Sequence, residues 1–410
     1  MQTDNKYTEK ARVLVEFYDR EYMENIVSLL HGTYSAVVYV CFSGDNVPTA
    51  RDRAALSRFV RNRFGFDPRF LEIEENTLPG ALGKLRSLIS DGRFYDFDIT
   101  GGSSIFIAAA GALMVEAGTE RMCIHEYDVT DGTCKVCCPK DRRSAAEGAE
   151  FDALTISEIL DLQGIKIVDT KSPIRYEMTR ELSDEILRLW EAVSGNLKEW
   201  NAFAVLPAEY TKTLSGVIVE KRMAEQQYAY FEPLLKRLAQ SGILSNLRFR
   251  SDGKHAFVTF CLNVPECAYV LYQKGGNLLE MLVYLTVVNN GCFGDCCIGI
   301  KLDWDDRTVN GYANPFNEID VVMTKGHIPY FVSCKNTKVE KDFLYEIMIM
   351  TKHFGGAYAV PVLLSTVENS NALRARAAEM GIVLIDHIGT MTAQEFAKKL
   401  DKEFCGAGHT

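Results

Sequence analysis

Short apolar runs open the chain and are separated by segments with helical periodicity. The strand-like runs cover residues 12–17, 36–42, 69–75, 94–100 and 121–129. Between them, apolar residues recur every three or four positions, which is typical of helices that pack on a core. Strand–helix alternation of this kind predicts a mostly parallel sheet with helices on both faces. We therefore expect residues 1–150 to form a Rossmann-like α/β domain.

The pattern changes between residues 151 and 270. Before this region, within residues 128–150, a stretch rich in Ala, Gly and charged residues follows a Thr-Asp-Gly turn and indicates a linker. Amphipathic helices are predicted over 181–200 and 222–240, and a strand pair around an Asp-Gly turn follows them. We interpret this region as a mainly helical connector, in which residues 222–262 also resemble a winged-helix module.

From residue 271 onward the pattern predicts a second α/β core. A helix follows two glycines at 275 and 276. The expected strands and helices alternate after it, with strands at 296–304, 317–324, 330–336, 357–365 and 382–386, and helices at 339–356 and 371–380. The order predicts a compact α/β/α domain over 271–410, within an α/β protein.

Composition narrows the class of protein. The 410 residues are enough for two or three domains, and 47% hydrophobic residues are typical of a globular protein. No apolar run reaches the length of a membrane span, and the first residues are too polar for a signal peptide. Twelve cysteines without a secretory signal predict reduced thiols in a cytoplasmic protein.

The net charge of −10 argues against a protein whose whole surface binds nucleic acid, but it leaves room for a local basic groove. Positive charge is concentrated at 51–63 and at 247–254. Charge patterning alone favours the interpretation that both clusters are solvated faces.

Acids and a lysine stand on the predicted hairpin 317–336. Glu318 and Asp320 are two residues apart and share one face, as do Ser333 and Lys335. An antiparallel hairpin brings the start of its first strand beside the end of its second. Carboxylates bind hard divalent cations, and a nearby lysine can stabilise a phosphoryl oxyanion. This set therefore suits metal-assisted phosphodiester hydrolysis; charge placed on an edge strand against aggregation is the alternative.

The sequence NEID…YFVSCK resembles the PD-(D/E)xK nuclease superfamily, which implies a restriction-endonuclease-like fold for residues 271–410. Glu280, in GGNLLE, occupies the place of the acid that many members carry on the preceding helix. The resemblance implies Mn²⁺ or Mg²⁺ held by Asp320, Glu318 and Glu280, with Lys335 and Ser333 completing the catalytic set. The chain departs from the family at Ser333, where an acid is usual, so Glu318 or Glu280 has to supply that carboxylate. Glu346, on the next helix, is interpreted as a solvent-facing acid.

The sequence DITGGSS, at 98–104, ends a strand and opens a helix. Its glycines let the backbone approach a ligand, and the N–H groups at the helix start favour anions. Ser103 and Ser104 can cap the helix or bind a phosphate. A tight strand-to-helix turn explains the same residues without any ligand, although ligands do bind at the carboxyl ends of parallel strands.

In this context the turn resembles CARF domains, which sense cyclic oligoadenylate. The resemblance implies a ligand site at Thr100, Gly101, Gly102, Ser103 and Ser104, with Tyr18, Asp19 and Arg20 after the first strand and Ser43 after the second. A CARF sensor joined to such a nuclease looks like the ancillary nucleases of type III CRISPR systems, which serve antiviral defence. This resemblance implies a homodimer that cuts DNA, RNA or both. It also implies that a cyclic oligoadenylate bridges the two sensors, and of cyclic tetra-adenylate and hexa-adenylate we favour the first.

Other interpretations stay open. The chain can be a ring-sensing regulator that binds nucleic acid without cutting it, or the sensor itself can degrade its ligand with Ser103 or Ser104. Cys123, His125, Cys134 and Cys137 can form a four-ligand zinc site. Strand alternation, however, sends Cys134 and Cys137 to opposite faces.

Overall fold

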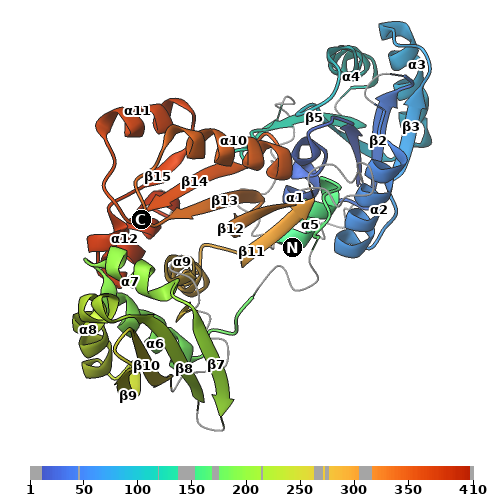
Figure 1. Ribbon diagram of the computed structural model, residues 1–410. Coiled ribbons are helices and arrows are strands. Elements are labelled where there is room, and N and C mark those ends of the chain that lie inside the picture. The colour runs from blue at the N-terminus through green and yellow to red at the C-terminus, as the bar shows by residue number, and fades with distance from the viewer. Residues whose placement is uncertain are drawn as a thin grey trace, which may run out of the picture. The chain divides into compact units, whose positions relative to one another are not determined.

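The computed structural model describes residues 12–44, 47–118, 120–136, 153–168, 175–213, 216–262, 271–272, 277–303 and 316–406. These residues form three β-sheets with helices packed against them, as expected for an α/β protein (Figure 1). Contacts divide the chain into two compact units. The first comprises Met1–Lys166 with the short segments Gly326–Ile328 and Lys352–Ala359, and the second comprises Ile167–Lys325, Pro329–Thr351 and Val360–Thr410.

The first unit contains a six-stranded sheet in the order β3-β2-β1-β4-β5-β6. Its strands are β1 (Arg12–Phe17), β2 (Ala36–Phe42), β3 (Arg69–Ile73), β4 (Phe94–Asp98), β5 (Met122–Tyr127) and β6 (Cys134–Val136). The first five are parallel, and only β6 runs antiparallel to its neighbour. The alternation of strands and helices predicted from the sequence is confirmed here.

Helices cover both faces of this sheet because its strands are apolar on both sides. Leu14 packs in a core with α1 (Val27–His31), α2 (Ala50–Phe64) and α5 (Ile156–Leu162). Val13 and Val15 pack on the opposite side with α3 (Leu78–Leu88) and α4 (Ser104–Ala117). The chain leaves β1 toward β2 and returns to β4 on the other side of β1, so β1 and β4 flank a topological switch point.

The second unit begins with an antiparallel sheet that the sequence analysis predicted only in part. Its order is β7-β8-β10-β9, with β7 (Ala208–Thr213), β8 (Gly216–Ala224), β9 (Leu244–Ser251) and β10 (His255–Leu262). Helices α6 (Arg180–Val193), α7 (Leu197–Ala204) and α8 (Glu225–Gln240) share one core with one face of this sheet. The connector therefore combines its helices with a four-stranded sheet, of which β7 and β8 were not expected, and α8 begins three residues later than predicted.

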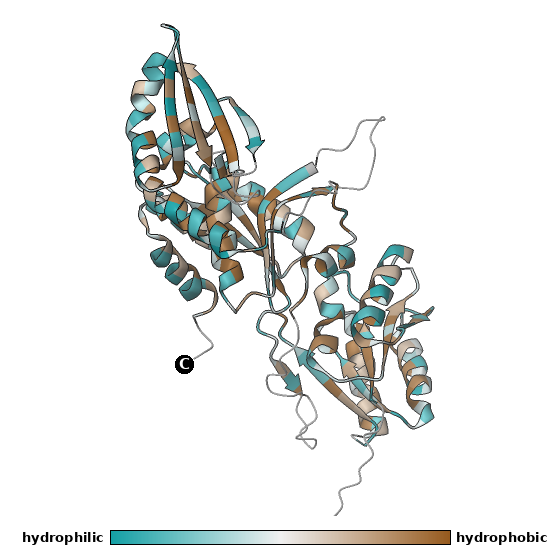
Figure 2. Ribbon diagram, turned by 90° about the horizontal axis from the view of Figure 1, so that it is seen from below, coloured by the Kyte–Doolittle hydropathy of each residue, from teal (hydrophilic) through white to brown (hydrophobic). Residues whose placement is uncertain are grey.

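A third sheet, of five strands, follows in the order β11-β12-β13-β14-β15. Its strands are β11 (Asp295–Asp303), β12 (Phe316–Lys325), β13 (Ile328–Lys335), β14 (Val360–Ser365) and β15 (Val383–Ile385), and β13, β14 and β15 run parallel. Helices α9 (Asn277–Asn289) and α12 (Ala393–Phe404) lie on one face, and α10 (Lys341–Gly355) and α11 (Asn371–Glu379) on the other (Figure 1). Figure 2 shows brown residues along many of the strands, and helices that carry both teal and brown residues, as expected of helices that pack one face on a sheet.

One expectation about the cysteines is wrong. Cys292, after α9, and Cys405, after α12, form a disulfide rather than two reduced thiols. Their Cα atoms lie 6.2 Å apart, within the range that a disulfide spans. Within the described ranges, no helix combines the length and the apolar character that a membrane crossing needs.

Candidate functional site

The β12–β13 hairpin places an acid beside a serine and a lysine. The two strands are joined at Gly326 and His327. Ser333 Oγ donates a hydrogen bond to Asp320 Oδ2 over 3.3 Å, and the backbone N–H of Cys334 donates to the same oxygen over 2.7 Å. These two bonds hold the Asp320 carboxylate against β13.

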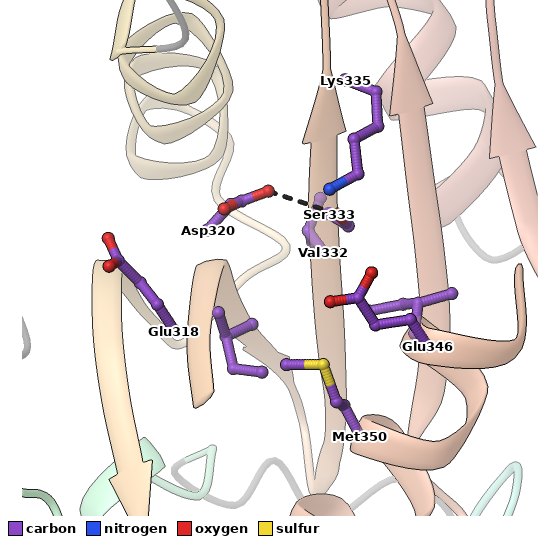
Figure 3. Close-up of a pocket in the computed structure, with 9 residues that line it drawn as sticks. Glu318, Asp320, Val332, Ser333, Lys335, Glu346 and Met350 are labelled. Carbon is purple, nitrogen blue, oxygen red and sulfur yellow. Dashed lines mark hydrogen bonds between the residues drawn. The ribbon is translucent and has the colours of Figure 1, made fainter. Parts of the chain in front are cut away.

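A pocket opens between this hairpin and helix α10 (Figure 3). Its lining contains Glu318, Ile319, Asp320, Val332, Ser333, Lys335, Glu346, Ile347 and Met350. Lys335 forms no ion pair with a carboxylate in the part of the chain that the structure describes, and its Nζ lies 4.6 Å from the centre of the Phe343 ring. The ammonium group is thus held by an aromatic face and is available to an anion that enters the pocket.

Glu346 is the acid whose position differs most from the interpretation of the sequence. It is exposed, as expected of a solvent-facing helix residue, yet its carboxylate faces into the pocket opposite the hairpin (Figure 3). Phe343, Glu346 and Met350 are spaced at i, i+3 and i+7 along α10, so all three lie on one helix face. That spacing is the signal in the sequence that points to Glu346.

The two other predicted acids are less central. Glu318 lies at the edge of the pocket, and its carboxylate is directed away from Lys335 and Glu346 (Figure 3). Glu280, on α9, does not line the pocket. It lies near the Cys334 thiol, whose pKa is raised well above its ordinary value by burial and then by the charges of Asp320 and Glu280.

Burial makes Asp320 a weaker acid than an exposed aspartate. Desolvation raises its pKa, and the charge of Glu318 adds to this. The Cys334 N–H, the Lys335 charge and the Ser333 hydroxyl act in the opposite direction because they stabilise the carboxylate. Asp320 is therefore a half-buried carboxylate that is stabilised by three partners, one of which is the positive charge of Lys335.

The carboxylates at the pocket are the type of ligand that binds a hard divalent cation. Asp320 and Glu346 offer carboxylate oxygens, which Mg²⁺ and Mn²⁺ prefer. Among the described residues, no group of three or more His, Cys, Asp or Glu side chains is arranged to hold a metal ion. That finding covers Cys123, His125 and Cys134 of the predicted zinc site; Cys137 lies outside the described residues.

The loops that follow β1 and β4 meet at the switch point of the first sheet. The Gly102 N–H donates to Asp19 Oδ2 over 3.3 Å, and Asp19 N–H donates to Asn25 Oδ1 over 2.8 Å. Gly102 has a φ of +86°, and a Cβ there would lie 2.4 Å from Phe17 Cβ. A Cβ on Gly101 would lie 2.8 Å from a Glu24 carboxylate oxygen. Gly102 is therefore required by the close approach of these two loops, whereas a side chain at Gly101 would have to displace the Glu24 carboxylate.

The remaining predicted ligand residues lie around this junction. Ser103 caps α4 by accepting a hydrogen bond from the Ile105 N–H, and Ser104 is the first residue of the helix. The Thr100 hydroxyl accepts a hydrogen bond from the Tyr127 N–H over 2.8 Å. Tyr18 donates its hydroxyl to Asp52 over 3.3 Å. Arg20 and Ser43 are exposed, after β1 and β2 respectively.

A buried polar cluster lies beneath these loops, and the sequence analysis missed it. Ser28, on α1, hydrogen-bonds Asp98, and its Oγ lies 3.2 Å from His125 Nε2. Glu16 is buried beside them, and burial followed by the charge of Asp98 raises its pKa well above the ordinary value. The signal for the cluster is that acids interrupt the apolar strands RVLVEF and FYDFD.

Comparisons with known proteins agree with this architecture. Residues 267–400 match the family model of the Card1-like endonuclease domain. Among solved structures, protein VC1899 from Vibrio cholerae is 16% identical with a TM-score of 0.71, over 97% of this chain and 99% of that one. Can2 from Sulfobacillus thermosulfidooxidans, solved in complex with cyclic tetra-adenylate, is 14% identical with a TM-score of 0.58, over 95% of this chain and 98% of that one. No curated protein matches the sequence.

The two solved structures share the fold of almost the whole chain. The family match concerns the last region of the chain. The β12–β13 hairpin, α10 and the pocket between them all lie within the matched residues. Residues 267–400 are therefore similar in sequence to the Card1-like endonuclease domain.

Proposed function

We propose that this protein is a metal-dependent endonuclease that cuts DNA, RNA or both and is activated by cyclic oligoadenylate. The observation that carries the proposal is the pocket in which Asp320, Ser333 and Lys335 face Glu346 inside a Card1-like endonuclease domain. We extend it to a role in antiviral CRISPR defence and to a homodimer with cyclic tetra-adenylate as the favoured ring, since Can2 was solved with that ligand.

Lys335 has the role of stabilising charge on the phosphate. Its ammonium lies at the pocket without a carboxylate partner among the described residues, so a phosphoryl oxygen can take that place. A fixed positive charge stabilises the transition state most where negative charge develops, and a water-poor pocket strengthens the effect.

Asp320 and Glu346 have the role of holding the divalent cation. Their carboxylates reach the pocket from β12 and from α10, and Ser333 leaves room where the family usually has an acid. A bound Mg²⁺ or Mn²⁺ would supply Lewis-acid polarisation of the scissile phosphate and a more acidic water. We therefore assign the carboxylate that Ser333 lacks to Glu346, in place of Glu318 or Glu280.

The switch point of the first sheet has the role of binding the ring. The loop Thr100–Ser104 presents backbone N–H groups at the start of α4, where phosphates are favoured. Asp19 fixes this loop through Gly102. A ring with two-fold symmetry suits a homodimer in which each protomer contributes the same loops.

Cleavage by the purified protein with Mn²⁺ tests the proposal. Labelled single-stranded DNA, single-stranded RNA and a plasmid are incubated with and without cyclic tetra-adenylate. We expect cutting only with the ring, and we expect Asp320→Asn and Lys335→Ala to lower the rate by about 100-fold or more. Ring binding, measured by calorimetry, stays unchanged in both variants.

Two glutamine substitutions test the assignment of the acids. Glu346→Gln is expected to lower the rate nearly as much as Asp320→Asn, whereas Glu318→Gln lowers it by less than about 10-fold. Undiminished cutting by both Asp320→Asn and Lys335→Ala would show that the pocket is not the active site. Equal cutting without the ring would refute the activation.

A further inference from the structure

One face of the β7-β8-β10-β9 sheet carries a cluster of arginines around an aromatic residue. Phe257, on β10, stands opposite Arg222 on β8 and opposite Arg250 on β9. Arg248 stands opposite Thr259, two residues further along β10. Residues directly opposite each other in adjacent strands point to the same side of a sheet. The three arginines therefore share a face, which we call the arginine face.

The arginine face is the side of the sheet that the helices leave open. Val219, Val258 and Phe260 point to the other side, into the core shared with α6, α7 and α8. Arg222, Arg248 and Arg250 are exposed. The face is thus accessible to a partner.

Aromatic and imidazole rings hold the guanidinium groups in place. The Arg250 guanidinium carbon lies 4.7 Å from the centre of the Phe257 ring, and that of Arg222 lies 5.9 Å from it. Arg222 Nη2 also lies 3.1 Å from His255 Nε2. Contacts of this kind restrict the side chains without neutralising them.

The charges of these arginines are not neutralised within the protein. Arg58, Arg86 and Arg376 are exposed as well, but each of these three has a carboxylate partner. Across the described ranges, no such ion pair involves Arg222, Arg248 or Arg250. In a chain of net charge −10, an unneutralised group of three marks a local site for an anion.

Two acids, Glu220 on β8 and Glu209 opposite it on β7, also lie on this face, and several acids around the arginines accept a hydrogen bond. Glu220 accepts one from Thr259, and Glu225 accepts one from Ser251. Asp252 accepts the backbone N–H groups of Lys254 and His255 in the β9–β10 turn. These acids stabilise the sheet and its turn, and none forms an ion pair with the three arginines.

The spacing of the arginines fits a chain of phosphates. Arg222 and Arg250 flank β10, so their backbones are about 10 Å apart, and Arg248 lies about 7 Å along β9 from Arg250. Guanidinium groups bind phosphate through two parallel hydrogen bonds. Positive surfaces that also present aromatic rings are typical of proteins that bind single strands.

We propose that the arginine face binds the sugar–phosphate backbone of a nucleic-acid strand. The identification of this nucleic-acid strand as the substrate of the endonuclease domain rests on the proposed function. Binding of the strand by the arginine face does not depend on it. The face would then raise the affinity for a strand without taking part in the cleavage step.

Binding of a labelled strand by the full-length protein tests this proposal. Fluorescence anisotropy is measured with a single-stranded oligonucleotide of about 25 nucleotides, as DNA and as RNA, in EDTA so that nothing is cut. The test variant is Arg222→Gln/Arg248→Gln/Arg250→Gln. The control, Arg58→Gln/Arg86→Gln/Arg376→Gln, removes the same charge from arginines that are paired and similarly exposed.

We expect the test variant to raise the Kd by at least about 10-fold and the control to change it by less than about 2-fold. The slope of log K against log salt should become shallower by about 2, because each lost phosphate contact removes about 0.7 for a single strand. A variant with lysine at the three positions keeps the charge and should recover most of the affinity. Thermal unfolding of each variant checks that the fold is intact.

An unchanged Kd and salt slope in the test variant would overturn the proposal. The proposed function fails separately, if the wild-type protein binds the strand but does not cut it with Mn²⁺ and the ring. If the chain cuts, the test variant should show a raised KM with an unchanged kcat, whereas a lowered kcat at saturating strand would contradict the assignment to binding alone.

Discussion

Lys221, on β8, has no exposed surface and still carries a group that is ordinarily charged. Its Nζ donates hydrogen bonds to the carbonyl oxygens of Ala204 over 3.1 Å and Leu206 over 2.9 Å. These carbonyls lie at the end of α7, where backbone acceptors lack partners within the helix. Burial lowers the pKa of Lys221 to about 8.

This lowered pKa predicts a pH dependence of stability. Between about pH 8 and pH 10.5 the unfolded chain holds a proton on this lysine that the folded protein has released, so stability gains from rising pH in that window. The gain is lost as the pH falls toward 8 and stays lost below it.

We expect the melting temperature of the wild type minus that of Lys221→Met to increase from pH 8 to pH 10. Lys236→Met, at an exposed lysine, should show no such trend; parallel curves for all three proteins would contradict the prediction.

At the residue scale, the sequence predicts those side-chain positions that follow from the geometry of one strand or one hairpin. Asp320, Ser333 and Lys335 were placed together correctly because residues two apart on a strand share a face and a hairpin pairs its ends. Glu346 was not, because its spacing with Phe343 and Met350 shows that the three share a helix face but not which face of the sheet they cover. Glu280 was assigned by resemblance, and the pocket does not include it.

At the scale of elements, the junction between β4 and α4 depends on Gly102. Its φ of +86° is unfavourable for other residues, and a Cβ would also lie 2.9 Å from the Phe17 carbonyl oxygen. The backbone of β1 and the loop before α4 are thus packed too closely for a side chain. The loop can only adopt this position with glycine there.

Gly102→Ala should therefore displace the loop from β1. We expect a loss of stability of at least about 1–2 kcal/mol, since the residue must adopt a left-handed conformation and also clashes with Phe17. Binding of cyclic tetra-adenylate should weaken in the same variant. Gly111→Ala, within α4, is the control: an added Cβ there would meet no atom within 4 Å, so the substitution should be neutral or stabilising by up to about 1 kcal/mol. Equal melting temperatures and ring affinities in the two variants would contradict this account.

The elements of the middle sheet show why its prediction was incomplete. Residues 216–224 read GVIVEKRMA, and the last five are strong helix formers that continue into EQQYAYF. In the structure they pair with β10 along their whole length, which places Val219 in the core. Pairing between distant segments overrides local preference here, and a single sequence does not show such pairing.

At the scale of the whole molecule, the net charge and the local distribution of arginines lead to different expectations about nucleic-acid binding. A net charge of −10 favours the interpretation that basic clusters are merely solvated. The fold gathers Arg248 and Arg250 with Arg222, which lies far from them in sequence, on one open face. The sequence shows the basic segment 247–254, but it does not show that β8 brings Arg222 to the same face.

The disulfide between Cys292 and Cys405 joins positions separated by 113 residues. All the strands from β11 to β15 lie inside the loop that it closes. Closing a loop of this length stabilises a fold by roughly 2–5 kcal/mol, largely by restricting the unfolded chain. Reduction should therefore lower the melting temperature of the wild type and leave that of Cys292→Ser unchanged.

The same loop determines how the chain comes apart when it is cut. A protease that cleaves one peptide bond between Cys292 and Cys405 leaves two fragments still joined through the sulfur atoms. On a non-reducing gel such a nicked chain should migrate near the intact protein, and on a reducing gel it should separate into two bands. In Cys292→Ser the two bands should appear on both gels. A break in the endonuclease core would thus leave the protein in one covalent piece until a reductant reaches it.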